Sequence, residues 1–299
     1  MTILNDDRYA RLLAMRAEHP EGLAEMAARR RRRALVEGDG NLMIIAFDHP
    51  ARGVLGVGDD RFAMADRRDA LDRCVRALRR PGVDGILATP DVVDDLLLLG
   101  ELEGKIVFGS MNRSGLAGSA WELDDRFTGY DPAALEDWGL DGGKMLLRLD
   151  YHDPGTNATI EACARAISDL ARRGLAAILE PLPVRRDENG RARVVEDIDL
   201  VVEAVSVASA LGAPSVRTWL KLPAVGDPER MMAATTLPSL LLGGDPGSEG
   251  NRLLDLWRRA MAIPHVRGLT AGRSLLYPRD GNVERWVDAA VEIVHGSGE

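Results

Sequence analysis

Short apolar runs alternate with amphipathic stretches over most of this chain. Eight runs are almost entirely apolar and have the length of buried strands. They are Leu42–Asp48, Val83–Thr89, Lys105–Ser110, Gly143–Asp150, Leu175–Glu180, Ser215–Leu222, Pro238–Gly243 and Val266–Ala271. The stretches between them repeat apolar residues at helical spacing. These are Arg61–Arg80, Pro90–Leu99, Pro132–Trp138, Asn157–Arg173, Val195–Leu211, Asp227–Thr235, Ser248–Ala262 and Asn282–His295.

Strands that alternate with helices along a chain predict parallel βαβ units, and eight such units predict a closed (β/α)8 barrel, or TIM barrel. The main alternative is a doubly wound open sheet, which usually carries Gly-x-Gly-x-x-Gly after its first strand. Here the first strand leads into Asp48-His-Pro-Ala-Arg-Gly53, which does not fit that motif. We expect one domain over residues 1–299, with N-terminal helices in 1–40 and the barrel in 41–299.

The N-terminal extension contains five consecutive arginines, Arg29–Arg33. They fall in a stretch with helical spacing, Leu23–Glu37, which predicts a solvated helix face or a contact between subunits of a homo-oligomer. The chain as a whole has a net charge of −9, which argues against a nucleic acid or an anionic membrane as a partner.

The composition of the chain predicts which residue types fill the core. Hydrophobic residues make up 45% of the chain but aromatic residues only 4%, so the core should consist mainly of Leu, Val, Ile and Ala, as in α/β barrels.

No apolar run approaches the roughly 20 residues that span a bilayer, and the first residues lack the apolar region of a signal peptide. Cys74 and Cys163 are predicted to be buried thiols without disulfide or zinc spacing. We therefore expect a cytoplasmic protein.

Lysine is rare in this chain. Among 38 basic residues only Lys105, Lys144 and Lys221 are lysines, and the last two lie inside predicted strands. A buried lysine costs desolvation energy unless it is paired or neutral. Unlike arginine, lysine can lose its proton and attack a carbonyl as a free amine. Lys144 and Lys221 are therefore candidates for covalent catalysis, with simple pairing to a carboxylate as the alternative.

In an α/β barrel, chemistry occurs at the carboxyl ends of the strands, and side chains alternate between the inside and the outside. Asp48, Lys144, Glu180 and Lys221 each fall in phase with one face of their strand, so we expect them to surround one cavity. Repulsion and desolvation would lower the pKa of Lys221, making it the nucleophile. Glu180, in an apolar setting, would hold a pKa suited to proton transfer. Alternatively, the four groups form only ion pairs that close the barrel.

Glycines follow the last two predicted strands. Gly243 and Gly244 end the seventh strand, and Gly272 precedes Arg273 at the end of the eighth. Loops at these positions commonly cradle a phosphate, where glycines admit backbone N–H groups and an arginine supplies a matching fork. Ordinary strand-to-helix turns are the alternative reading. If the substrate is instead an unphosphorylated keto acid, Arg148 or the loop of Arg113 is the candidate partner.

Several short segments, in the order of the barrel, resemble class I aldolases of the deoxyribose-phosphate and tagatose-bisphosphate aldolase superfamily. They are Ala46-Phe-Asp-His49, Lys144-Met-Leu-Leu-Arg-Leu-Asp150, Leu179-Glu-Pro-Leu182, Leu220-Lys-Leu-Pro223 and Gly272-Arg273. The resemblance implies a Schiff base on Lys221, proton transfer by Glu180, and assistance from Asp48 and Lys144. It also implies a phosphate held by the glycines and Arg273.

The resemblance further implies a cofactor-free, homo-oligomeric enzyme acting on a sugar phosphate. The chain is similar to an actinobacterial branch linked to inositol breakdown. This similarity implies cleavage of 5-dehydro-2-deoxyphosphogluconate to dihydroxyacetone phosphate and malonate semialdehyde.

Two alternatives stay open. A metal-dependent (class II) aldolase could use His49 and His152, which follow the first and fourth predicted strands beside carboxylates. A barrel that binds a sugar phosphate without turning it over would need the same pocket.

Overall fold

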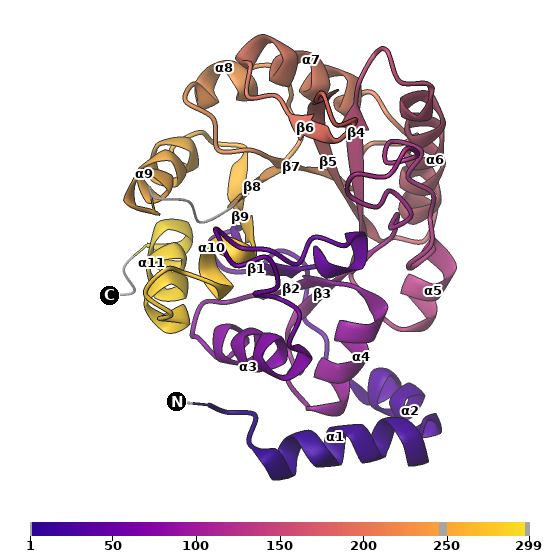
Figure 1. Ribbon diagram of the computed structural model, residues 1–299, viewed down its shortest axis with the longest axis vertical. Coiled ribbons are helices and arrows are strands. Elements are labelled where there is room, and N and C mark those ends of the chain that lie inside the picture. Colours follow the sequence, from indigo (N-terminus) through magenta and orange to yellow (C-terminus); the bar gives the residue numbers. More distant parts are fainter. Residues whose placement is uncertain (1, 245–249, 297–299) are drawn as a thin grey trace.

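The computed structural model describes residues 2–244 and 250–296, and eight parallel strands there close into a barrel (Figure 1). The strands are β1 (Leu42–Phe47), β2 (Gly85–Ala88), β3 (Ile106–Ser110), β4 (Gly142–Leu149), β5 (Ala176–Arg186), β7 (Thr218–Leu222), β8 (Ser239–Leu242) and β9 (Val266–Ala271). Their order is β4-β3-β2-β1-β9-β8-β7-β5, and pairing of β4 with β5 closes the ring. The predicted (β/α)8 barrel is confirmed.

Helices surround the barrel. They are α3 (Arg67–Leu78), α4 (Pro90–Leu98), α5 (Pro132–Asp137), α6 (Pro154–Arg172), α7 (Ile198–Ser209), α8 (Pro228–Met232), α9 (Gly250–Met261), α10 (Arg273–Leu276) and α11 (Val283–His295). A short 3-10 turn, η1 (Pro50–Arg52), follows β1. The N-terminal helices α1 (Asp6–Glu18) and α2 (Glu21–Arg29) lie outside the ring, below α3 and α4 in Figure 1. Ser248, the predicted first residue of the helix that corresponds to α9, lies outside the described residues.

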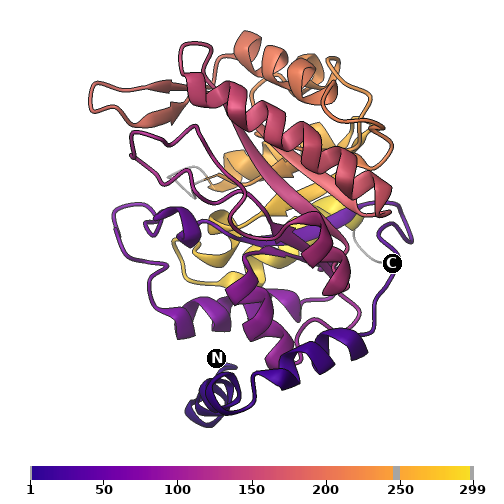
Figure 2. The ribbon, with the colours of Figure 1, turned by 90° about the vertical axis from the view of Figure 1, so that its right-hand side faces the viewer.

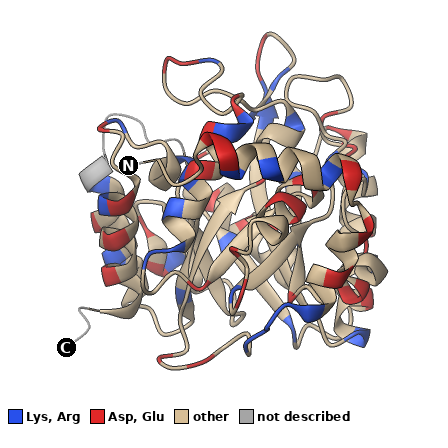
Figure 3. Cartoon of the chain, turned by 90° about the horizontal axis from the view of Figure 1, so that it is seen from below, with Lys and Arg blue, Asp and Glu red and all other residues tan. Residues whose placement is uncertain are grey.

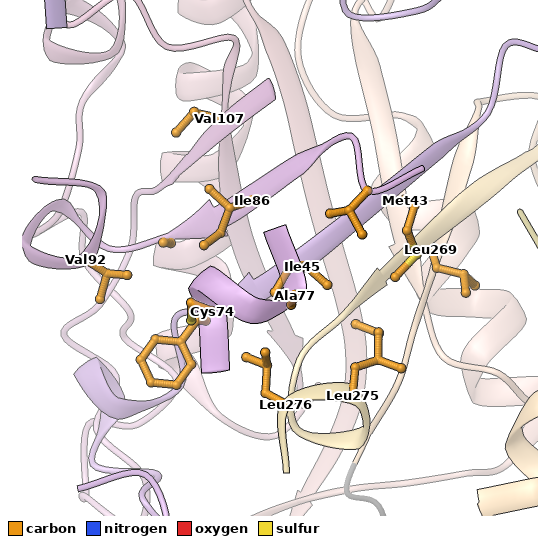
Figure 4. Close-up of a cluster of buried hydrophobic side chains, with 14 of the residues drawn as sticks. Met43, Ile45, Cys74, Ala77, Ile86, Val92, Val107, Leu269, Leu275 and Leu276 are labelled. Carbon is orange, nitrogen blue, oxygen red and sulfur yellow. The ribbon is translucent and has the colours of Figure 1, made fainter. Parts of the chain in front are cut away.

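Side chains alternate along the strands and build two apolar layers. Leu42, Ile44 and Ala46 point into the barrel and pack there with residues such as Phe108 and Trp219. The intervening residues point outward against the helices. Figure 4 shows this outer layer, where Met43 and Ile45 lie near Cys74, Leu275 and Leu276. The two cysteines are free and buried, as predicted.

The arginine run closes the amino-terminal end of the barrel. Helix α2 ends at Arg29, so the helix predicted through Glu37 is wrong beyond that residue. Arg30, 5% exposed, donates to the backbone oxygens of Lys105 and Gly139, each at 2.7 Å. Arg33 pairs with Asp84 at 2.6 Å.

Carboxylates at the strand starts account for this arrangement. Arg32 pairs with Asp141 at 3.1 Å, and Asp141 also accepts a hydrogen bond from the backbone N–H of Val107. Because Asp84 and Asp141 directly precede β2 and β4, an extended arginine segment beside them satisfies buried charges that a helix would leave unpaired. On the outer helices, acidic and basic residues are interspersed (Figure 3).

Strand β5 continues beyond the barrel, which the sequence did not predict. Its last residues pair antiparallel with β6 (Ala192–Val194), and Val184 lies opposite Val194. This hairpin projects from the carboxyl end of the barrel (Figure 2). The predicted strand ended at Glu180, whereas β5 runs through Pro181 and Pro183 to Arg186. Among the described helices, none combines the length and hydropathy that crossing a membrane requires.

Candidate functional site

A cavity of about 740 Å³ opens at the carboxyl end of the barrel. Among the residues that the structure describes, seven cationic side chains line it, namely Arg52, Arg113, Lys144, Arg148, Lys221, Arg252 and Arg273. Four anionic side chains from the same described residues do so, namely Asp48, Glu122, Glu180 and Glu196. The cavity is therefore rich in positive charge, although the whole chain carries a net charge of −9. This contrast favours an anionic ligand.

The structure brings Asp48, Lys144, Glu180 and Lys221 together at the bottom of this cavity. Glu180 lies between the two lysines: one carboxylate oxygen pairs closely with Lys144 and the other lies 3.0 Å from Lys221. Lys144 also lies 3.3 Å from Asp48. The exposed fraction of each side chain is below 10%, so these charges interact in a poorly hydrated space. The ion pairs considered as an alternative are present.

Strand alternation positions the four groups. Asp48 directly follows β1 in phase with its inward residues, and Glu180 continues the inward face of Ile178. Lys221 follows Trp219 on the inward face of β7. The inward apolar residues of the same strands form the layer beneath the cluster.

The pKa of Glu180 differs from the sequence-based expectation. Burial alone would raise it, but the charges of Lys144 and Lys221 outweigh burial and lower the pKa to about 2. Glu180 is thus a carboxylate at neutral pH, and the expected pKa suited to proton transfer is wrong for the resting protein. The expectation rested on an apolar setting and did not include two lysines on one carboxylate.

The other charged groups in the cluster are also perturbed. Burial lowers the pKa of Lys144 to about 8, although Asp48 and Glu180 partly oppose this shift. For Asp48, burial is outweighed by Arg113 and Lys144, which hold its pKa well below the usual range. Lys144 therefore changes its charge near physiological pH, whereas both carboxylates stay ionised.

Arg113 is a member of this cluster that the sequence reasoning considered only as a possible keto-acid ligand. Its guanidinium pairs closely with the carboxylate of Asp48 and donates to the backbone oxygen of Asp48 at 2.9 Å. It also donates to the hydroxyl of Ser110 at 2.6 Å. Arg113 lies in a loop three residues after β3, where no periodicity reveals the direction of a side chain.

The predicted anion-binding residues lie side by side at the ends of β8 and β9, where Leu242 pairs with Thr270. Gly243, Gly244, Gly272 and Arg273 all line the cavity. A Cβ atom on Gly272 would lie 2.2 Å from the backbone oxygen of Ala46, so only glycine fits there.

Two hydroxyl groups lie beside these glycines. Those of Thr270 and Ser274 are buried and have no hydrogen-bond partner within the described residues. Thr270 lines the cavity, and a Cβ atom on Gly243 would lie 2.1 Å from the Ser274 hydroxyl oxygen. Unpaired buried hydroxyls favour a ligand that accepts hydrogen bonds at this end of the cavity.

Arg148 lies on the opposite side of the barrel, on β4. Its guanidinium pairs with Glu122 and donates to the backbone oxygen of Gly115 at 3.0 Å. Burial lowers its pKa to about 10, with the nearby charge of Arg52 adding to the effect. The side chain of Arg148 therefore contacts the loop after β3, across the barrel from the glycines of β8 and β9.

The two histidines considered for a metal site do not converge. His49 lines the main cavity, whereas His152 lines a separate small pocket of about 60 Å³. Burial lowers the pKa of His49 to about 3, which makes it neutral. Among the described residues, no group of three or more His, Cys, Asp or Glu side chains is arranged to hold a metal ion.

Fold and site define an α/β barrel with buried lysines and carboxylates beneath a cationic cavity. The chain belongs to the Cgl0159-like family, which residues 40–291 match. It is similar to the crystal structure of Cgl0159 from Corynebacterium glutamicum, with 46% identity over 99% of both chains and a TM-score of 0.96. Among curated proteins, none matches the chain.

More distant likenesses show a shared fold. An archaeal fructose-1,6-bisphosphate aldolase, solved with its catalytic lysine bound covalently to the carbinolamine intermediate, has 18% identity and a TM-score of 0.64. The likeness covers 92% of this chain and 100% of that one. A fructose-bisphosphate aldolase from Slackia heliotrinireducens has 15% identity and a TM-score of 0.62, over 87% and 86% of the two chains.

Proposed function

We propose that this protein is a class I aldolase that cleaves or forms a carbon–carbon bond in a keto-sugar phosphate through a Schiff base on Lys221. The observation that carries the proposal is the pair of buried lysines that share Glu180 beneath a cationic cavity. The archaeal aldolase that shares this fold uses a covalently bound catalytic lysine, which supports the proposal.

Lys221 suits the nucleophile better than Lys144. Lys144 contacts two carboxylates, whereas within the described residues Lys221 pairs with one, Glu180. Lys221 also lies on β7, which neighbours β8, so it is closer in the barrel order to the proposed phosphate end. A ketone whose phosphate lies at Gly243 and Arg273 would present its carbonyl toward Lys221.

The first step is imine formation. The neutral amine of Lys221 attacks the carbonyl carbon, the carbonyl oxygen takes up a proton, and water leaves as the iminium forms. Lys144, whose pKa is about 8, is the proton donor within the cluster. Lys221 carries no ammonium charge as the free amine or as the carbinolamine, so the pKa of Glu180 then rises above the value of about 2 that it has beside two ammonium groups.

Cleavage follows from the same arrangement. Glu180 removes the proton from the substrate hydroxyl, the neighbouring carbon–carbon bond breaks, and its electron pair flows into the iminium to give an enamine. The aldehyde fragment leaves, the enamine carbon takes a proton, and water releases the ketone fragment from Lys221. Asp48 is held by Arg113 and Lys144 and orients Lys144 for proton transfer.

The family resemblance also supports a particular substrate and a particular assembly. We propose 5-dehydro-2-deoxyphosphogluconate as a candidate substrate, with dihydroxyacetone phosphate and malonate semialdehyde as products. A homo-oligomer is proposed on the same basis. The run Arg29–Arg33 does not support an interface between subunits, because Arg30 and Arg33 already have partners within the chain.

The experiment that tests the proposal measures release of dihydroxyacetone phosphate from a panel of keto-sugar phosphates, with and without EDTA and borohydride. We expect cleavage that EDTA does not affect and that borohydride abolishes only when substrate is present. Activity that EDTA removes, without borohydride sensitivity, would indicate a metal-dependent enzyme. Binding of sugar phosphate without turnover of any panel member would indicate a binding protein.

A further inference from the structure

The buried cluster around the two lysines holds unequal numbers of fixed charges. Asp48 and Glu180 supply two negative charges. Lys144, Lys221 and Arg113 would supply three positive charges if both lysines were protonated. Arg113 is 8% exposed and pairs directly with Asp48, so its charge belongs to the cluster.

The cluster can remove the surplus charge in one way. A guanidinium does not lose its proton in a protein, and both carboxylates are ionised, so the proton must leave a lysine. Without Arg113, two ammonium groups would balance two carboxylates, and the cluster would carry no surplus charge. With Arg113, a cluster that holds one neutral lysine is electrically balanced.

We propose that Arg113 is a positioning residue that occupies Asp48 and thereby keeps one lysine of the pair unprotonated for attack on a carbonyl. This inference rests on the proposed Schiff-base function and adds the group that activates the nucleophile. Arg113 does not touch the reacting atoms itself, since its contacts are with Asp48 and Ser110.

The remaining neighbours of the lysines support this charge balance. Within the part of the chain that the structure describes, the charged and titratable groups around the pair are Asp48, His49, Arg113, Glu180 and Arg273 at the carboxyl end of the barrel and the buried thiol of Cys163 on α6. Burial raises the pKa of the Cys163 thiol, so this thiol adds no charge. His49 is neutral because burial lowers its pKa to about 3. Arg273 lies at the end of β9, where its charge acts on His49.

The test measures how the reactivity of each lysine depends on pH. The protein is labelled with acetic anhydride between pH 5 and 11, and mass spectrometry quantifies acetylation at each lysine. The chain has three lysines, so each is followed separately. Lys105 is an internal reference, because its ammonium donates to the backbone oxygen of Val83 at 2.5 Å, at the other end of the barrel.

We expect Arg113→Gln to raise the labelling midpoint of the more reactive lysine in the pair by at least about one pH unit. The borohydride-trapped adduct with dihydroxyacetone phosphate should then fall about tenfold or more at pH 7 and recover near pH 10. A role in packing alone would lower trapping equally at all pH values. The midpoint of Lys105 should not move.

Two further variants keep the test decisive. Arg52→Gln is the matched control, since Arg52 is a buried arginine of the same wall that pairs with Asp125 and not with Asp48. It should leave the lysine midpoint in place. Asp48→Asn removes a negative charge, so it should shift the midpoint downward, and it tests the charge balance if Arg113→Gln does not fold.

The outcomes separate the two proposals. An unchanged midpoint in Arg113→Gln, or an upward shift in Asp48→Asn, overturns the role of Arg113. A midpoint that moves as expected in a protein that traps no carbonyl compound at any pH supports the charge balance and contradicts the Schiff-base function.

Discussion

Replacing Glu180 by Gln separates imine formation from the steps that follow it. The change removes a carboxylate that contacts both lysines but preserves the shape of the side chain. Lowering the pKa of Glu180 from 4.5 to about 2 corresponds to roughly 3 kcal/mol of favourable interaction between this carboxylate and its surroundings. The variant loses this interaction and leaves two lysines and Arg113 around Asp48.

Two consequences follow from that magnitude. The lysines hold their protons less tightly, so the Schiff base still forms, but its cleavage lacks the base. We expect the cleavage rate to fall about 10²- to 10⁴-fold while trapped adduct accumulates. We also expect a loss of stability of about 2–4 kcal/mol at pH 6 and a smaller loss at pH 9, where the lysines are less charged.

Single-turnover kinetics with borohydride quenching measure both the adduct and the product, and urea unfolding at the two pH values measures stability. Glu122→Gln serves as a control, because Glu122 is a buried carboxylate in the same cavity that pairs with Arg148. It should lower stability without accumulation of adduct. Cleavage by Glu180→Gln within tenfold of the parent rate would refute the role of Glu180.

Three other variants test separate parts of the account. Lys221→Arg retains the charge but cannot form an imine, so turnover should fall by several orders of magnitude with an unchanged circular dichroism spectrum; activity within tenfold of the parent would reject Lys221. Arg273→Ala should raise KM for sugar phosphates about ten- to a hundredfold, because a charge-assisted contact to phosphate is worth about 1.5–3 kcal/mol. Imine formation on dihydroxyacetone should not change, and an unchanged KM for sugar phosphates would show that the phosphate does not bind at Arg273. In His295, hydrogen bonding to Asp84 and then to Asp39 raises the pKa to about 9, so its protonated ring stabilises the fold fully below about pH 6.5 and progressively less as the pH rises through 9. His295→Gln should therefore lower the free energy of unfolding by about 1–2 kcal/mol at pH 6 but little at pH 10; an equal loss at both would contradict that charge.

The sequence was sufficient for the barrel and for the four residues at its centre. Both follow from the two-residue period of strands, which determines whether Asp48, Glu180 or Lys221 points inward once the strand is recognised. The meeting of Gly243 and Gly272 was predictable for a related reason: glycines at the ends of adjacent strands come together in space, because parallel strands end on the same side of the barrel.

Features outside regular periodicity were not predictable. Arg113 reaches Asp48 from a loop, and only the folded chain shows that its positive charge belongs to the cluster. The arginine run has helical spacing, but the buried carboxylates of Asp84 and Asp141, distant in sequence, draw it into an extended segment. The pKa of Glu180 likewise depends on two lysines from neighbouring strands, which no local pattern contains.

The most direct test of the account is the position of the covalent adduct. The protein is incubated with dihydroxyacetone phosphate, reduced with borohydride and digested. Mass spectrometry then measures the masses of the peptides that contain Lys105, Lys144 and Lys221. The account predicts the mass of the reduced adduct on Lys221, absent from Lys221→Arg. An adduct on Lys144 instead, or no adduct with any keto-sugar phosphate that the protein cleaves, would contradict it.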